Sequence, residues 1–260
     1  MGVINLPKTI VEAKVIGQQI LSKDVKLIEV FAPEIARTAK PGQFVNVQVS
    51  KQAAPLLRRP FGVAGVNYKS GTFTMIYRIM GEGTKILAEL CSGDIISIIG
   101  PLGHGFDLTA KHPLLVGGGL GLAPLLYLAQ SFLKKNVEVL MGGRTSSELF
   151  WQDLFNEETL AMHMTTDDGS LGTKGTVNAL LPQLLETGKY DCVYVCGPVP
   201  MMKAVVKVVE KAGLPCQISL EKYMACGFGA CLSCACGGVG KRLKVCTDGP
   251  VFWSTEVEEW

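Results

Sequence analysis

The sequence predicts an α+β multidomain chain, with an antiparallel β-barrel, a doubly wound α/β domain and a small C-terminal module rich in cysteine. Three observations support this division. Short apolar runs separated by turn residues fill the first part, strand-like and helix-like runs alternate in the second, and glycine and cysteine dominate the third. The expected boundaries are 1–107, 108–215 and 216–260.

The first part is expected to hold six short strands, at 9–16, 25–31, 44–49, 62–66, 72–79 and 95–99. In the third of these, Val45, Val47 and Val49 alternate with Asn46 and Gln48, which predicts a strand with one face in water. Strands at this spacing, separated by glycine-containing turns, favour a small antiparallel barrel. One helix is expected at 84–90.

Strands and helices alternate after residue 106. Strands are expected at 114–116, 137–141, 161–164 and 192–196, and helices at 124–133, 177–185 and 201–212. This alternation is typical of a parallel, doubly wound sheet. The uncharged stretch 113–132 is long enough to span a membrane, but its glycines and Pro124 favour a buried strand, a turn and a helix. From Cys216 onward we expect irregular loops.

Composition narrows the class of protein. Of 260 residues, 48% are apolar, so the chain can bury sizeable cores. A net charge of +2 argues against binding nucleic acid through bulk positive charge. Nine cysteines without a signal peptide favour a reducing compartment. We therefore expect a cytoplasmic protein that binds neither nucleic acid nor membrane.

Four cysteines near the C-terminus have the spacing of iron–sulfur ligands. Cys226, Cys231 and Cys234 form C-x4-C-x2-C, and Cys246 follows twelve residues later. Plant-type [2Fe-2S] clusters use this spacing, in which a tight loop supplies three thiolates and a separate segment returns the fourth.

Other interpretations of these cysteines remain open. A structural zinc site usually uses paired C-x2-C knuckles, and here only Cys231 and Cys234 are so spaced. Buried free cysteines are also common in protein cores. Cys236 could replace Cys246 as the fourth ligand, but all four ligands would then come from one short loop. The spacing favours Cys246.

Two segments of the first part have chemistry suited to phosphate. Arg58 and Arg59 precede Pro60, and an arginine pair can bind a pyrophosphate through bidentate contacts. A solvated basic edge is the alternative. Further on, Gly83 and Thr84 begin the expected helix, whose N-terminus could bind phosphate, although Thr84 could simply cap it.

A glycine-rich turn opens the second part. Residues 117–121 read Gly-Gly-Gly-Leu-Gly between a strand and a helix, which allows dinucleotide phosphates to approach the backbone. Pro124 stands where the fingerprint G-x-G-x-x-G has its last glycine. Cys196, Gly197 and Pro198 end a later strand at the same edge, although Cys196 could instead be a buried core residue.

Together these segments resemble the ferredoxin reductase superfamily over nearly the whole chain. Residues 59–62 (Arg-Pro-Phe-Gly) are similar to its R-x-[YF]-[ST] flavin motif, with Gly62 in place of the hydroxyl residue. Residues 117–124 are similar to its pyridine-nucleotide turn, and residues 196–198 to its C-G-P motif. The C-terminal cysteine run resembles the electron-transfer subunits of class 1B dihydroorotate dehydrogenases.

This resemblance implies a flavin-binding barrel with FAD, a nucleotide-binding domain with NAD as co-substrate, and one [2Fe-2S] cluster in the C-terminal module. The implied partner is an FMN-containing dihydroorotate dehydrogenase catalytic subunit, in a heterotetramer with two copies of each chain. Electrons would pass from FMN through the cluster and FAD to NAD⁺ in pyrimidine biosynthesis. The resemblance equally covers subunits of NAD(P)H–ferredoxin transhydrogenases and sulfhydrogenases. A zinc-binding interaction module is the non-enzymatic alternative.

The resemblance also implies the ligands of each group, and no catalytic acid or base within the chain. For FAD they are Arg59, Pro60, Phe61, Gly62, Ile76, Tyr77, Arg78, Gly83 and Thr84. For NAD they are Gly118, Gly119, Gly121, Cys196, Gly197 and Pro198. For the cluster they are Cys226, Cys231, Cys234 and Cys246. We further expect the partner to cover apolar groups near the cluster, namely Phe228, Leu232 and Trp253.

Overall fold

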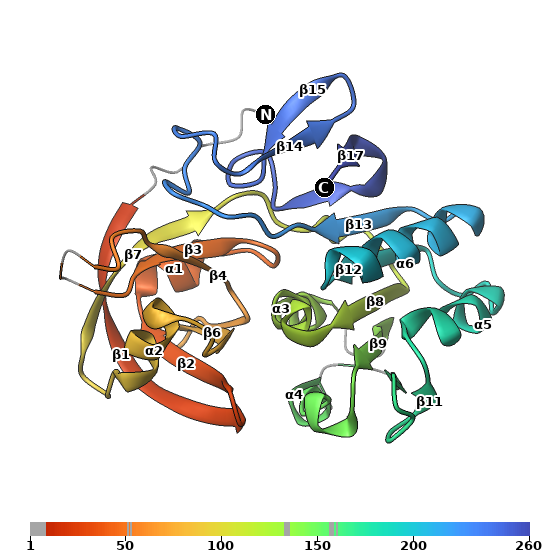
Figure 1. Ribbon diagram of the computed structural model, residues 1–260, viewed down its shortest axis with the longest axis horizontal. Coiled ribbons are helices and arrows are strands. Elements are labelled where there is room, and N and C mark those ends of the chain that lie inside the picture. Colours follow the sequence, from red (N-terminus) through yellow and green to blue (C-terminus); the bar gives the residue numbers. More distant parts are fainter. Residues whose placement is uncertain (1–8, 51, 53, 133–135, 156–158, 160) are drawn as a thin grey trace.

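The computed structural model describes residues 9–50, 52, 54–132, 136–155, 159 and 161–260. Three β-sheets organise the chain: a barrel, a parallel sheet covered by helices, and a small sheet above the junction between them (Figure 1). The predicted fold class is confirmed.

The barrel is antiparallel and contains seven strands in the order β4-β3-β7-β1-β2-β6-β5. Their bounds are β1 (Thr9–Ser22), β2 (Val25–Phe31), β3 (Phe44–Gln48), β4 (Arg59–Gly62), β5 (Gly65–Asn67), β6 (Thr72–Arg78) and β7 (Ile95–Leu102). Helices α1 (Pro33–Thr38) and α2 (Glu82–Glu89) lie in its connections; α1 was not predicted.

The strand expected at 62–66 is instead the junction of β4 and β5. The backbone N–H of Val63 donates to the Gln43 carbonyl at 3.0 Å, and that of Ala64 donates to the Thr74 carbonyl at 2.9 Å. These two bonds link the edges of the sheet, so the two-residue bend closes the barrel.

The second sheet has the order β11-β10-β9-β8-β12-β13-β16, and all its strands are parallel except β16. Their bounds are β8 (Pro113–Gly118), β9 (Glu138–Gly143), β10 (Ala161–Thr166), β11 (Thr173–Lys174), β12 (Cys192–Cys196), β13 (Cys216–Ser219) and β16 (Val251–Trp253). The loops expected from Cys216 onward are therefore wrong in part, because β13 and β16 extend this sheet beyond the boundary expected at residue 215.

Helices cover both faces of this sheet, as a doubly wound fold requires. Leu115 packs in one core with α3 (Leu122–Ser131) and α4 (Trp151–Phe155). Its neighbours Leu114 and Val116 pack in another with α5 (Leu181–Glu186) and α6 (Val199–Lys211). The uncharged stretch forms β8, a turn and α3, as predicted.

Helix α3 also joins the two large sheets. Tyr127 belongs to the core of the barrel, and its hydroxyl donates to the Ala39 carbonyl at 2.8 Å. Figure 1 shows α3 between the barrel and β8. Within the described part of the chain, no helix is both long and apolar enough to cross a membrane.

The third sheet is antiparallel and has the order β15-β14-β17, with β14 (Ala235–Gly238), β15 (Lys241–Lys244) and β17 (Val257–Glu259). The chain leaves the second sheet after β13, forms β14 and β15, returns to that sheet through β16, and then completes the small sheet with β17. The C-terminal module is therefore anchored in the nucleotide-binding sheet on both sides.

The outer face of β3 does not lie in water, contrary to the expectation from its alternating pattern. Phe44 is 4% exposed and Asn46 is fully buried. Phe44 shares a core with Cys234 and Cys246, whereas Val45 and Val47 point into the barrel. The C-terminal module covers this face of the strand.

Candidate functional site: a cavity shared by three modules

One cavity of about 1090 Å³ is lined by residues of the barrel, the second sheet and the cluster loop, which we define as residues 221–234. The candidate residues in its wall are Arg59, Pro60, Phe61, Gly62, Ile76, Tyr77, Arg78, Thr84 and Cys196. The nucleotide turn contributes Leu120, Ala123 and Pro124, and the cluster loop contributes Met224, Ala225 and Ser233. The predicted flavin segment, nucleotide turn and cysteine loop therefore meet at one place.

The two adjacent arginines both line the cavity but make different contacts. Arg58 is bound to strands β3 and β7: its guanidinium donates to the Ser97 carbonyl at 2.7 Å and to Gln48 Oε1 at 3.2 Å. The guanidinium of Arg59 reaches the start of α2, where a Cβ built on Gly83 would lie 3.1 Å from Arg59 Nε. Of the two, Arg59 is the one beside the start of α2.

Thr84 caps α2. Its hydroxyl accepts from the backbone N–H of Met80 at 3.0 Å and of Gly81 at 3.1 Å, and donates to the Gly81 carbonyl. These bonds satisfy amides that would otherwise lack partners at the helix end. Thr84 also lines the cavity, so the capping and binding interpretations are compatible.

The side chains of the flavin strand β6 alternate. Tyr77 packs in the barrel core, and its hydroxyl donates to Gln18 Oε1 at 2.5 Å. Ile76 packs instead with the core of the second sheet, and Arg78 pairs with Asp24 at 3.1 Å. A ligand in the cavity can therefore meet the side chains of Ile76 and Arg78, while Tyr77 supports the strand from inside.

The positions of the nucleotide turn favour glycine for different reasons. A Cβ on Gly118 would lie 2.6 Å from Met201 Sδ, and one on Gly121 would lie 2.5 Å from Gly197 Cα. Gly119 has φ +56° and no atom within 4 Å of its Cβ position. Gly118 and Gly121 thus serve packing, and Gly119 is the member of the turn open to a ligand. Pro198 is the N-cap residue of α6.

Cys196 and Glu221 also line the cavity. Burial raises the pKa of the Cys196 thiol, so it stays protonated at neutral pH. Desolvation also raises the pKa of the Glu221 carboxyl. Sequence reasoning missed Glu221, which follows the unrecognised strand β13 at the ligand-binding edge of the sheet; recognising that strand would have revealed it.

The four predicted cluster cysteines come together as two pairs. The Ser233 hydroxyl lies 3.2 Å from Cys231 Sγ; hydrogen bonds from Ser233 and then Cys226 lower the pKa of Cys231 to about 6. The backbone N–H of Cys246 points to Cys234 Sγ at 3.5 Å. Burial first, and then contact with Cys234, raise the pKa of Cys246 to about 12.

This donor set fits a cluster of two irons, because each iron takes two thiolates. Gly227 and Gly229 have φ of +78° and +94°, and Leu232 has +62°, so the loop curls tightly around the thiols. Among the described residues, no three His, Cys, Asp or Glu side chains are arranged around a single metal ion.

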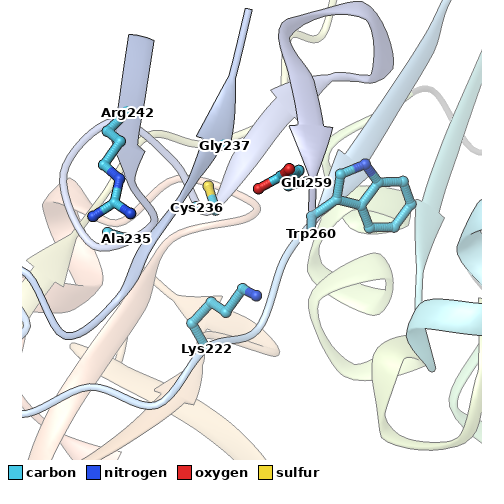
Figure 2. Close-up of a pocket in the computed structure, with 7 residues that line it drawn as sticks. All are labelled: Lys222, Ala235, Cys236, Gly237, Arg242, Glu259 and Trp260. Atoms are coloured by element: carbon cyan, nitrogen blue, oxygen red, sulfur yellow. The ribbon is translucent and has the colours of Figure 1, made fainter.

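Cys236 lies in the same core as Cys234 and Cys246 but faces a different cavity. It lines a separate cavity of about 340 Å³ with Lys222, Arg242, Glu259 and Trp260 (Figure 2). It belongs to β14, whereas Cys246 follows β15 on the returning arm. This arrangement supports Cys246 as the fourth ligand.

The apolar groups expected around the cluster are only partly there. Leu232 is 63% and Phe228 is 44% exposed on the cluster loop. Trp253, however, lies in β16, pairs with Gln217 and packs against the core of the second sheet. Its expected place on the cluster surface is wrong.

Comparison with known proteins agrees with this three-part site. An oxidoreductase FAD-binding domain matches residues 12–106, and an oxidoreductase NAD-binding domain matches residues 115–207. The iron–sulfur cluster binding domain of dihydroorotate dehydrogenase B matches residues 221–258.

Two curated relatives are named dihydroorotate dehydrogenase B (NAD(+)), electron transfer subunit. The one from Caldanaerobacter subterraneus subsp. tengcongensis is 44% identical over 224 residues, covering 84% of this chain and 86% of the relative. The one from Desulforamulus reducens is 38% identical over 254 residues, covering 95% of this chain and 97% of the relative.

Solved structures share the fold. A structure of the NADH-dependent reduced ferredoxin-NADP oxidoreductase has a TM-score of 0.85 at 30% identity, over 96% of this chain and 90% of that one. The ferredoxin reductase in carbazole 1,9a-dioxygenase has a TM-score of 0.68 at 22% identity, over 82% of this chain and 68% of that one. At this identity the similarity extends to the fold only.

The barrel, the doubly wound sheet and the cysteine loop around one cavity define a ferredoxin-reductase-like oxidoreductase with FAD, NAD and [2Fe-2S] domains. Within that class, the chain belongs to the family of dihydroorotate dehydrogenase B (NAD(+)) electron transfer subunits. It is therefore the electron-transferring component of an oxidoreductase that also has a catalytic subunit.

Proposed function

We propose that this chain carries electrons from an FMN-containing dihydroorotate dehydrogenase subunit to NAD⁺ in the de novo synthesis of pyrimidines. The observation that supports this most is the single cavity of about 1090 Å³, whose wall includes the flavin strand, the nucleotide turn and the cluster loop. Groups bound at these three places would lie close enough together for electrons to pass between them.

The barrel residues are proposed to hold FAD. Arg59 would pair with the pyrophosphate at the start of α2, where Gly83 leaves room for its guanidinium. Pro60, Phe61 and Gly62 form the adjoining wall of the cavity, together with the side chains of Ile76 and Arg78. The core position of Tyr77 keeps the strand rigid beneath them.

The turn between β8 and α3 is proposed to hold NAD(H). Gly119 would let a phosphate approach the backbone, and the packing of Gly118 and Gly121 fixes the shape of the turn. Cys196, Gly197 and Pro198 would form the neighbouring wall, where the protonated Cys196 thiol offers an uncharged surface to a nicotinamide.

The cluster loop is proposed to hold the [2Fe-2S] cluster through Cys226, Cys231, Cys234 and Cys246. The low pKa of Cys231 makes its thiolate available as a ligand at neutral pH. Bound flavin supplies exchange between two-electron hydride chemistry and one-electron transfer. The chain itself contributes position and shielding rather than a proton donor or acceptor.

The proposed assembly is a heterotetramer with two copies of each subunit. A one-electron donor must lie near its acceptor, so the partner is expected to cover the cluster loop around the exposed Leu232. Reduced thiols and an iron–sulfur cluster favour the cytoplasm, where thiols are kept reduced.

Anaerobic co-expression with the neighbouring genes tests this function. We expect a yellow-brown complex with FAD, two irons and two sulfides per copy of this chain, and a partner with FMN that reduces NAD⁺ with dihydroorotate. A colourless protein containing zinc would overturn the proposal.

A transhydrogenase role is the second candidate, because the NADH-dependent ferredoxin-NADP oxidoreductase matches 96% of this chain with a TM-score of 0.85. It predicts a different co-purifying partner and NADPH-linked reduction of ferredoxin. The same co-purification and assays with dihydroorotate and with ferredoxin separate the two.

A further inference from the structure

Asn46 is buried between the flavin strand and the cluster loop. It is fully buried on the outer face of β3, and the strand register pairs it with Pro60 of β4. Its side-chain Nδ2 donates to the backbone carbonyl of Cys226 at 3.2 Å. One amide therefore joins the first cysteine of the cluster loop to the strand beside the flavin motif.

Gly227 shows that this contact is close on the loop side as well. A Cβ built on Gly227 would lie 2.6 Å from Asn46 Nδ2 and 3.3 Å from its Cγ. The backbone of Gly227 has φ +78°, a conformation that favours glycine. The loop next to Cys226 can therefore approach the barrel this closely only because residue 227 has no side chain.

The side-chain amide of Asn46 lowers the stability of the folded state. Its Oδ1 is buried and has no hydrogen-bond partner among the described residues. A buried polar atom without a partner destabilises the folded state, so packing alone would favour an apolar side chain of the same size. The donated bond to Cys226 is the contact that an apolar side chain could not make.

We propose that Asn46 is a positioning residue for electron transfer, which holds Cys226, and through it the cluster, at a fixed distance and orientation from the flavin. This inference rests on the proposed function. Groups that hydrogen-bond the residues ligating a metal orient those ligands and tune the metal, and losing one typically costs 10–100-fold in affinity or activity.

The test compares Asn46→Leu with Gln48→Leu in the co-expressed complex. Gln48 lies two residues along the same strand and bonds Arg58 instead of the cluster loop. We expect both variants to keep FAD, iron, sulfide and a melting temperature close to that of the parent. Asn46→Leu alone should shift the midpoint potential and the EPR spectrum of the cluster, and slow its reduction by NADH at least about tenfold.

An Asn46→Leu complex with the parent potential, spectrum and reduction rate would overturn the inference. Absence of cluster and flavin from the parent itself would instead overturn the proposed function. If Asn46→Leu does not fold, Gly227→Ala perturbs the same contact from the loop side and should shift the cluster spectrum. A Gly227→Ala complex with the parent cluster spectrum would then contradict the inference.

Discussion

Gly121 rests directly on the peptide between Cys196 and Gly197. A Cβ on Gly121 would lie 2.5 Å from Gly197 Cα and closer still to the Cys196 carbonyl. The parallel strands β8 and β12 are neighbours in register, with Cys196 opposite Gly117. The two segments proposed to bind NAD therefore support each other, and neither can move alone.

Gly121→Ala is expected to disturb both segments at once. The new methyl must push the Cys196–Gly197 backbone away, and overpacking of this kind costs about 1–3 kcal/mol. We expect a lower free energy of unfolding and a raised KM for NADH. Gly17→Ala is the control, because no atom lies within 4 Å of its Cβ position. Equal effects of the two variants would contradict the proposed packing role.

Arg144 and Glu148 are expected to set the preference for NAD over NADP. Arg144 follows β9, the second strand of the nucleotide-binding unit, where an arginine can bind the 2′-phosphate of NADP. Its Nε donates to Glu148 Oε1 at 2.7 Å and its backbone N–H to Glu148 Oε2 at 2.9 Å. This pairing keeps the pKa of Glu148 below its usual value, so the carboxylate is charged and would repel a phosphate.

Glu148→Gln should therefore lower the KM for NADPH by about tenfold, the equivalent of one charge-assisted hydrogen bond. The KM for NADH should change little. Steady-state kinetics with both nucleotides measure the ratio, and Glu186→Gln, an exposed carboxylate on α5, is the control. An unchanged ratio would mean that selectivity lies elsewhere.

Cys246 and Cys236 are expected to respond differently to replacement by serine. Cys246→Ser removes a proposed ligand and should lower iron and sulfide content and abolish the parent EPR signal. Cys236→Ser changes a thiol in the separate cavity of Figure 2 and should keep both. Iron and sulfide analysis of anaerobic preparations of both variants tests this difference. Loss of iron and sulfide in Cys236→Ser but not in Cys246→Ser would assign the fourth ligand to Cys236.

Glu138 is expected to make stability depend on pH. It is 4% exposed and accepts hydrogen bonds from Lys189 at 2.6 Å and Tyr190 at 2.7 Å, with His163 Nε2 at 2.8 Å. Burial alone would raise the pKa of this carboxyl, but the bonds from these partners lower it below the usual value.

A lowered pKa means that the carboxylate stabilises the fold above the pKa of the unfolded chain, about 4.3. This contribution is lost as the pH falls through the lower pKa of the folded state. Glu138→Gln should lower the free energy of unfolding by about 1–3 kcal/mol at neutral pH, and by less in acid. Urea unfolding at pH 7 and pH 4 measures this; a constant difference would contradict the assignment.

The sequence predicted the elements that local pattern controls. Residues 25–31 and 192–196 form strands with the expected bounds, because short runs rich in β-branched and apolar residues define them locally. The glycine-rich turn and the first three cysteines of the cluster pattern were recognised in the same way, since each lies within a short stretch of sequence.

Features that depend on distant segments were missed. Asn46 alternates with valines, which predicts a wet position, but the cluster loop, far away in sequence, covers it. Arg58 has the same local chemistry as Arg59, yet its guanidinium donates to the carbonyl of Ser97 in β7, 39 residues away in sequence. β13 is four residues long and becomes a strand only by pairing with β12 and β16.

The return of the chain through β16 has a consequence for engineering. Because the cysteine-bearing segment begins and ends in one sheet, a stop codon before residue 221 would remove β16 as well. The outer edge of β13 would then expose unpaired amides and carbonyls, which invite aggregation. A soluble reductase stripped of its metal centre is thus better sought by replacing single thiols than by shortening the gene.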